Sequence, residues 1–249
     1  MKNTHSSSKR LESLDALRGF DLFFLVALGP LMHSLARTAN VEWLNESMWV
    51  FSHVSWEGFS PWDLIMPLFL FMSGISMPFS LSRYKSISDK RPLLRRLAKR
   101  ILLLWIFGMM CQGNLLALDP NTIYLYSNTL QAIATGYLIT ALLFLFTSRR
   151  TQIITAVVLL LVYWTTMQFI TVDGYGGGNY TPQGNLAEWI DNTVLGRFRD
   201  TAQVIDGKMV VADWYHYTWI LSSLNFGVTV LTGLFAGYIA VSYTHLRAH

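Results

Sequence analysis

The stretch FSHVSWEGFSPWDLIMPLFLFMSGISMPFSLS, residues 51–82, joins a polar, aromatic loop to a long apolar run. The run is about twenty residues long, which matches the hydrocarbon thickness of a bilayer. Two prolines and a glycine interrupt it, and a membrane helix tolerates them where the freed backbone groups meet neighbouring helices or a wet cavity. His53 and Asp63 stand at the mouth of this helix, so the stretch predicts a membrane span with a polar site beside a cavity. An interfacial aromatic belt with polar residues at headgroup level is the alternative interpretation.

The composition of the whole chain is typical of a membrane protein. Its 249 residues are 52% hydrophobic and 14% charged. In a soluble domain about a quarter of the residues are charged. The one cysteine, Cys111, lies in an apolar run, which excludes a disulfide framework and a cysteine-based metal site. No two histidines stand at the spacing of metal ligands, so no metal is expected.

Six apolar segments predict an all-α integral membrane protein, a multi-pass bundle of six transmembrane helices. The spans cover about residues 14–36, 62–82, 101–118, 128–147, 152–171 and 217–240, and residues 37–61 and 172–216 are the expected outer loops. Residues 1–241 are interpreted as one transmembrane domain. The tail 242–249, SYTHLRAH, resembles translated sequencing adapter, so we interpret it as non-native and expect the chain to be truncated.

The distribution of Lys and Arg predicts that the N-terminus lies inside. With that orientation fifteen of the nineteen Lys and Arg residues fall in inner segments, as the positive-inside rule requires. Eight of them lie in residues 83–100, which we interpret as a cytoplasmic loop rather than a nucleic-acid-binding run. The four outer ones are Arg37, Arg197, Arg199 and Lys208. His53 and Asp63 are then expected on the outer side.

His53 is the obvious general base in the outer cluster, because a neutral imidazole accepts a proton near physiological pH. Asp63, ten residues later, can orient it through the second ring nitrogen, as the carboxylate of a catalytic triad does. His53 can instead attack an acyl donor itself and carry the acyl group. Gln131 and Asn128 can offer amide donors to a developing oxyanion. His216 is a competitor, although its place in DWYHYTW favours an interfacial residue.

A second polar cluster opens the first span. Asp15, Arg18 and Asp21 lie within roughly 120° of one another on a helix. Ionisable groups that enter a membrane segment tend to face the bundle interior and to pair, and Asp15 and Arg18 are spaced to do so. The cluster is expected at the cytoplasmic mouth. A positive-inside anchor is the alternative role for Arg18.

Two blocks of sequence resemble a known family. Residues 10–19, RLESLDALRG, fit the pattern R-x-x-S-x-D-x-x-R-G, and residues 53–67, HVSWEGFSPWDLIMP, fit H-x-S-W-x-G-x(4)-D-x(3)-P. Both patterns are similar to those of heparan-alpha-glucosaminide N-acetyltransferase and its bacterial relatives, a family of transmembrane acyltransferases. Later segments at 130–131, 185–197 and 219–237 resemble this family in the same order.

The resemblance implies an acetyl-CoA-dependent acyltransferase. Such an enzyme moves an acetyl group from cytoplasmic acetyl-CoA to a sugar amine or hydroxyl on the outer face of the membrane. The family's active histidine falls on His53, and its acidic positions fall on Asp15 and Asp63. The residues expected to bind substrate or cofactor are Asp15, Arg18, Trp56, Asn128, Gln131 and Asp191. The chain departs from the family pattern at Glu57, Ala132 and Asn192, so the acceptor is not carried over.

The expected partners are the lipid bilayer, acetyl-CoA and an amino sugar or glycan acceptor; a homodimer is left open, and nucleic acid is not expected. The expected location is the bacterial inner (plasma) membrane. The alternative function is a multi-pass transporter or flippase for a glycan precursor, in which residues 62–82 line a path and His53 relays protons. The lack of an inverted repeat in the sequence disfavours it.

Overall fold

The computed structural model describes residues 12–111, 115–205 and 208–246. Arg10 of the first motif, and Lys2, Lys9 and Arg247 of the orientation argument, lie outside the described residues. The helices are α1 (Glu12–Phe23), α2 (Gly29–Ala39), α3 (Glu42–Ser47), α4 (Ile65–Ile75), α5 (Met77–Leu81), α6 (Arg91–Cys111), α7 (Thr129–Phe146), α8 (Arg149–Phe169), α9 (Leu186–Leu195) and α10 (Ser223–Leu246). Two antiparallel hairpins pair β1 (Thr171–Val172) with β2 (Tyr175–Gly176) and β3 (Gln203–Ile205) with β4 (Lys208–Val210).

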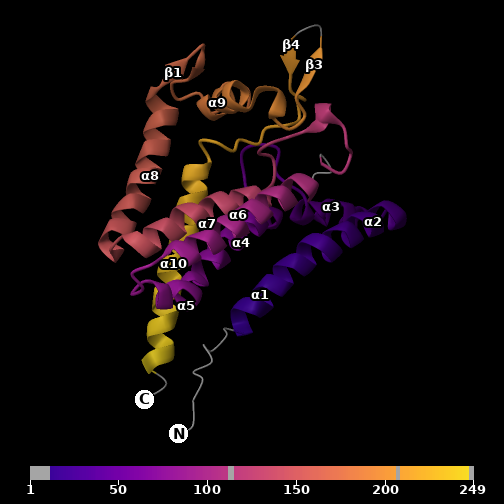
Figure 1. Cartoon of the computed structure of the whole chain (residues 1–249). Helices are drawn as coiled ribbons and strands as arrows, with labels where there is room; N and C mark the ends of the chain where they lie inside the picture. Colours follow the sequence, from indigo (N-terminus) through magenta and orange to yellow (C-terminus); the bar gives the residue numbers. More distant parts are fainter. Residues whose placement is uncertain (1–11, 112–114, 206–207, 247–249) are drawn as a thin grey trace.

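Figure 1 shows the start of α1 and the end of α10 toward the bottom of the view, and α9, β3 and β4 at the top. Among the described residues, five helical segments are long and apolar enough to cross a membrane. They are Glu12–Ala39, Pro61–Tyr84, Thr129–Phe146, Arg149–Phe169 and Ser223–Ser242. The prediction of an all-α membrane protein is confirmed at this level, while the count of six spans and the orientation stay predictions.

The third predicted span, 101–118, is placed differently in the structure. Helix α6 begins at Arg91, inside the segment interpreted as a loop, and ends at Cys111. The loop prediction failed because α6 is amphipathic: Leu93 and Leu97 are buried while the cations between them face outward. The apolar part, 101–111, has eleven residues and is about 16 Å long, shorter than the hydrocarbon core of about 30 Å.

The last predicted span and the second outer loop also differ. Helix α10 begins at Ser223 rather than near 217. The Asp191 carboxylate accepts the backbone N–H of Trp219 at 2.6 Å and of Ile220 at 3.0 Å, which holds this segment in a turn before the helix. The loop 172–216 contains α9 and strands β2, β3 and β4.

Helix α10 is the centre of the bundle, packed against α4, α7 and α8. The largest buried cluster includes Leu70 of α4, Tyr137 of α7, and Val230 and Leu234 of α10. Small residues allow close packing of membrane helices, and Gly233 of α10 does so here. A Cβ on Gly233 would lie 2.0 Å from the carbonyl oxygen of Phe71. Helices α4 and α10 therefore touch backbone to backbone.

Replacing Gly233 by Ala is expected to lower the free energy of unfolding by about 1–3 kcal/mol, because the added methyl group pushes α10 away from α4. Thermal unfolding of the purified protein in detergent measures the loss. Gly19→Ala is the matched control, since a Cβ there has no heavy atom within 4 Å. Equal unfolding midpoints for the two variants would contradict the backbone contact.

Candidate active site

The imidazole of His53 and the carboxylate of Asp63 lie at hydrogen-bond distance. The Nδ1 of His53 is 2.7 Å from Oδ1 of Asp63. His53 follows a short 3-10 turn, Met48–Phe51, and Asp63 belongs to the 3-10 turn Pro61–Leu64 that leads into α4. With Nδ1 donating to the carboxylate, Nε2 is the nitrogen left to accept a proton. This is the geometry that the sequence predicted for a base and its orienting partner.

A capping arrangement fixes the orientation of Asp63. Its Oδ2 accepts the backbone N–H of Ser60 at 2.8 Å, and the Ser60 hydroxyl lies 3.0 Å away. That hydroxyl is also 2.7 Å from the carbonyl oxygen of Ser52, which ties the turn to the loop that carries His53. Asp63 thus caps the helix and holds the imidazole with the same carboxylate.

Aromatic rings frame His53. The ring of Trp62 meets it edge-on at 6.4 Å, and that of Tyr217 does so at 6.3 Å. Trp62 in turn rests on Gly29, where an added Cβ would lie 2.3 Å from the indole. The glycine at the start of α2 therefore lets the indole reach the helix and support the imidazole.

Three cavities share His53 in their walls. The helix cavity, about 510 Å³, is mostly apolar and includes Leu22, Met66, Phe69, Cys111 and Ile133. The loop cavity, about 430 Å³, includes Trp56, Trp214, His216 and Tyr217. The Asp200 cavity, about 390 Å³, includes Asn128, Asp200 and Trp219. The imidazole is 53% exposed, so it is open to ligands from more than one side.

Asn128 and Gln131, the predicted oxyanion donors, have different surroundings. Asn128 lines both the helix cavity and the Asp200 cavity, and its Oδ1 caps α7 by accepting the N–H of Leu130 at 2.8 Å. Gln131 is fully buried. Its Oε1 accepts the N–H groups of Ser127 and Asn128, and its amide donates to the carbonyl of Leu125 at 2.7 Å. Asn128 therefore lines the same cavities as His53. Gln131 instead stabilises the start of α7.

Asp191, a predicted binding residue, is fully buried at the base of the outer loops. Burial raises its pKa to about 6, although the hydrogen bonds that it accepts from two backbone N–H groups act to lower the pKa. Its role in the structure is to join α9 to the segment before α10, and it lines none of the three cavities described above.

Arg199 is a residue that the sequence did not single out beyond its charge. Its side chain has no exposed surface and forms a bidentate ion pair with Glu188, with both N–O distances at 2.5 Å. It also donates to Asn192 and, at 3.4 Å, to the carbonyl of Tyr217. The guanidinium thereby fixes the backbone of a residue that touches His53. A buried arginine has no local sequence signal, because its partners lie elsewhere in the chain.

The remaining predicted residues fall at two places. Trp56 lines the loop cavity, and its Nε1 donates to the carbonyl of Tyr180 at 2.8 Å. Asp15 and Arg18 lie near the start of α1, 3.8 Å apart, and Arg18 donates to the carbonyl of Met72 on α4 at 3.3 Å. The bond from Arg18 to Met72 joins α1 to α4 and is compatible with an anchoring role for Arg18.

The sequence profile described as heparan-alpha-glucosaminide N-acetyltransferase, catalytic, matches residues 10–175, more than half of the chain. The chain belongs to this family. No curated protein matches it. Membership in the N-acetyltransferase family indicates an acetyltransferase-like membrane enzyme that uses an acyl donor.

The family match divides the site into two parts. His53, Asp63 and Asn128 lie within the matched residues, whereas Asp191, Arg199 and the aromatic segment around Tyr217 lie beyond Tyr175. In the part of the chain that the structure describes, no group of three or more His, Cys, Asp or Glu residues could hold a metal ion.

Proposed function

We propose that this protein transfers an acetyl group from cytoplasmic acetyl-CoA to an amine or hydroxyl of a sugar on the outer face of the plasma membrane. The observation that carries the proposal is the His53–Asp63 pair, held at 2.7 Å where three cavities meet. A histidine that is oriented by a carboxylate and open on two sides can act between a donor and an acceptor.

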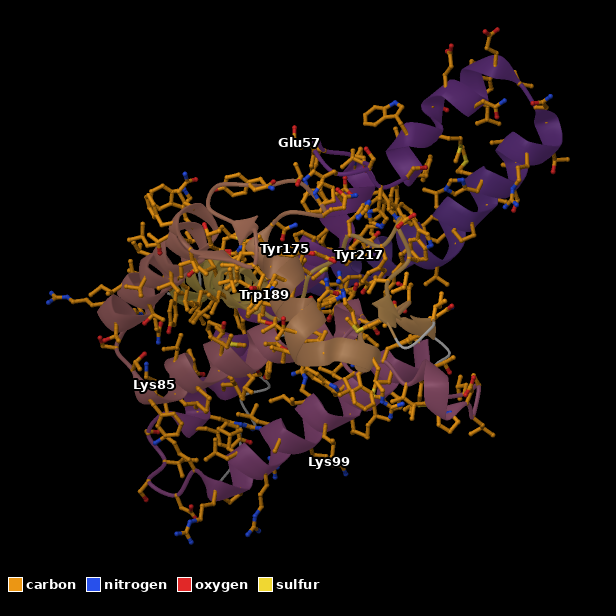
Figure 2. All side chains as sticks on the ribbon, turned by 90° about the horizontal axis from the view of Figure 1, so that it is seen from above. Glu57, Lys85, Lys99, Tyr175, Trp189 and Tyr217 are labelled. Carbon is orange, nitrogen blue, oxygen red and sulfur yellow. The ribbon has the colours of Figure 1, made fainter. Side chains whose placement is uncertain are left out.

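Acetyl-CoA, the acetyl donor, is proposed to bind along α6. Arg96, Lys99 and Arg100 line a hollow of about 320 Å³ together with Leu103, Leu104 and Phe107. Residues 96, 100, 103, 107 and 111 follow one face of the helix, and Cys111 lines the helix cavity beside His53. The three cations suit the phosphates of CoA, and the apolar residues suit its thioester arm. In Figure 2, Lys99 lies at the opposite side of the view from Glu57, which is in the loop of His53.

The transfer balances by either of two routes. In direct transfer, Nε2 of His53 removes a proton from the acceptor as its nitrogen or oxygen attacks the thioester carbonyl. The C–S bond then breaks, and the imidazolium returns that proton to the CoA thiolate. In the two-step route, Nε2 attacks the thioester carbonyl, the C–S bond breaks, and CoA leaves as a thiolate that takes a proton from solvent. The acceptor then attacks the acetyl-imidazole, the bond from the acetyl carbon to Nε2 breaks, and the proton that the acceptor loses passes to the freed Nε2 and from there to solvent. Asp63 stabilises the positive imidazole in both routes.

Asn128 is proposed to stabilise the oxyanion that forms on the thioester carbonyl. Its Oδ1 is used by the N–H of Leu130, so its Nδ2 is the group that can donate to a ligand in the cavities shared with His53. Gln131 is not proposed for this role, because its amide supports the start of α7.

The test uses purified protein in nanodiscs with radiolabelled acetyl-CoA and a panel of amino sugars and their hydroxyl analogues. Release of CoA coupled to labelled acceptor is the expected result. A glycan transporter would move its cargo across the bilayer without consuming acetyl-CoA. Intact acetyl-CoA with every acceptor, together with uptake of a labelled glycan into proteoliposomes, would overturn the proposal in favour of transport.

Lys99→Gln is expected to raise the KM for acetyl-CoA about tenfold with little change in kcat, because the variant loses one charged contact to a phosphate. Arg95→Gln, on the same helix but outside the hollow, removes the same charge and is the control. Initial rates at varied acetyl-CoA concentration measure both. An equal KM in the two variants would place the donor phosphates elsewhere.

A further inference from the structure

The reaction proposed above does not use Asp21, the third ionisable residue of the cluster on α1. Asp21 is 3% exposed and, with Leu14, belongs to the buried residues of this helix. Its Oδ2 is fully buried and has no hydrogen-bond partner among the residues that the structure describes. The pairing expected for this cluster is found between Asp15 and Arg18, 3.8 Å apart. Asp21 is therefore a buried carboxyl group that still requires an explanation.

The cation nearest to Asp21 in the sequence is used by other groups. Arg18, one turn earlier on α1, directs its guanidinium to Asp15 and to the carbonyl oxygen of Met72. A carboxylate that is buried without a counter-ion is so costly that the group takes up a proton instead. The uncharged acid is therefore the form of Asp21 that suits this position.

Helix α4, which packs against α1, carries no counter-ion for Asp21. None of its residues, Ile65–Ile75, is ionisable, and the same holds for the π-helical turn Phe24–Leu28 that follows α1. The buried hydroxyl of Ser73 donates to the carbonyl oxygen of Leu70 in its own helix, at 2.7 Å. A metal cation requires several oxygen ligands, whereas a proton requires one carboxylate oxygen. These surroundings suit a proton.

Asp21 lies between the start of α1 and the helix cavity. The steps from Asp15 to Arg18, to Asp21 and to Leu25 are three or four residues long, so the four side chains follow one face of the helical segment. Asp15 and Arg18 are about one-third exposed. Leu25 lines the helix cavity together with His53. A proton held by Asp21 is thus one helical turn from the cavity and one turn from groups that solvent reaches.

We propose that Asp21 is a proton-binding site, and that the proton which the CoA thiolate takes from solvent reaches it through this carboxyl group. The inference rests on the two-step route of the acetyl transfer proposed above. In that route CoA leaves before the acceptor has lost a proton, so the proton of the thiol has another source. The O–H bond of Asp21 breaks as the proton passes through water in the helix cavity and the S–H bond forms. The products are CoA–SH and the Asp21 carboxylate, and a proton from the expected cytoplasmic side restores the acid.

Infrared spectroscopy of the protein in nanodiscs tests the proton site without acetyl-CoA. A protonated carboxyl group has a C=O stretching band apart from the amide and carboxylate bands. At neutral pH the wild type is expected to show this band and Asp21→Asn to lose its intensity. Asp89→Asn, an exposed change in the loop before α6, is the matched control and should keep the wild-type spectrum. An Asp21→Asn spectrum equal to that of the control would mean that Asp21 is ionised and would overturn the proposal.

The substitution is suited to the test because asparagine has nearly the size of aspartate and is neutral, as the proposed acid is. The unfolding midpoint of Asp21→Asn is therefore expected to equal that of the wild type. Asp21→Glu is the second variant, which keeps the acid and should shift the band instead of removing it. If Asp21→Asn does not fold, an Asp21→Glu band at the wild-type position would overturn the assignment.

Release of CoA–SH without acceptor measures the delivery of the proton. Asp21→Asn is expected to slow it at least about tenfold, because an acid that donates in the reaction has been removed. The loss should grow as the pH is raised, because solvent protons become scarcer while the thiolate attacks the acetyl-imidazole and reverses the step. A change that only disturbed packing would give the same loss at every pH. Asp21→Glu is expected to restore part of the rate.

The two measurements separate this inference from the proposed reaction. Equal rates and equal pH profiles in Asp21→Asn and Asp89→Asn, with acetyl transfer intact, would overturn the delivery of a proton to CoA. A wild type that leaves acetyl-CoA intact would contradict the proposed function instead. The infrared band would then still decide whether Asp21 binds a proton.

Discussion

Replacement of His53 by Ala is expected to lower kcat for acetyl transfer by about 10³-fold, within the range of about 10²- to 10⁴-fold for a general base. The reason is that Nε2 is the proton or acetyl acceptor of either route. Among the residues that the structure describes, no other titratable side chain lines all three cavities. Steady-state release of CoA in the presence of acceptor measures the loss. A variant that keeps wild-type turnover would remove His53 from the reaction.

The fold should tolerate this substitution. The side chain of His53 is 53% exposed, and Asp63 is the hydrogen-bond partner of its imidazole. The unfolding midpoint of His53→Ala is therefore expected close to that of the wild type. Glu46→Ala, an exposed change on α3 outside the three cavities, serves as the control for the outer segment.

The same preparation distinguishes the two routes of transfer. Incubation of the wild type with labelled acetyl-CoA and no acceptor leaves the label on the protein if His53 carries the acetyl group. Direct transfer predicts no retained label, although labelled acceptor still forms once an amino sugar is added. Label that persists in His53→Ala would place the acetylated side chain elsewhere.

Asp63→Asn is expected to lower kcat by up to about 10⁴-fold, the loss that the analogous change causes in a serine protease triad. The carboxylate uses Oδ1 for His53 and Oδ2 for Ser60. An amide has one oxygen, so it can serve only one of the two, and its NH₂ group facing Nδ1 would favour the wrong tautomer of the imidazole. Rates at saturating acetyl-CoA measure the effect.

Ser60→Ala separates the capping role of Asp63 from its role toward His53. The variant loses the hydroxyl that lies near Ser52 and Asp63 but keeps the backbone N–H and the bond between His53 and Asp63. We expect a loss of less than about tenfold in kcat, in line with one neutral hydrogen bond of about 1 kcal/mol. Equal losses in Ser60→Ala and Asp63→Asn would mean that the loop position, and not the imidazole orientation, limits the rate.

The sequence by itself determined the features that depend on local composition. The apolar runs marked the membrane helices, because burial in hydrocarbon depends on the residues of one segment. The spacing of His53 and Asp63 led to the correct contact, because both lie in one short loop closed by the cap at Ser60. The limits of α6 were missed because its first half alternates buried leucines with outward-facing cations.

The tertiary structure alone decided what the buried polar groups touch. Asp191 meets the backbone of Trp219, 28 residues further along the chain, and Arg199 meets Glu188 across the turn after α9. These contacts carry Asp200 into a cavity with His53. No local sequence pattern predicts that these residues lie close together. A buried polar group that lacks a hydrogen-bond partner costs free energy wherever it lies in the sequence. Which residue becomes its partner depends on how the whole chain packs.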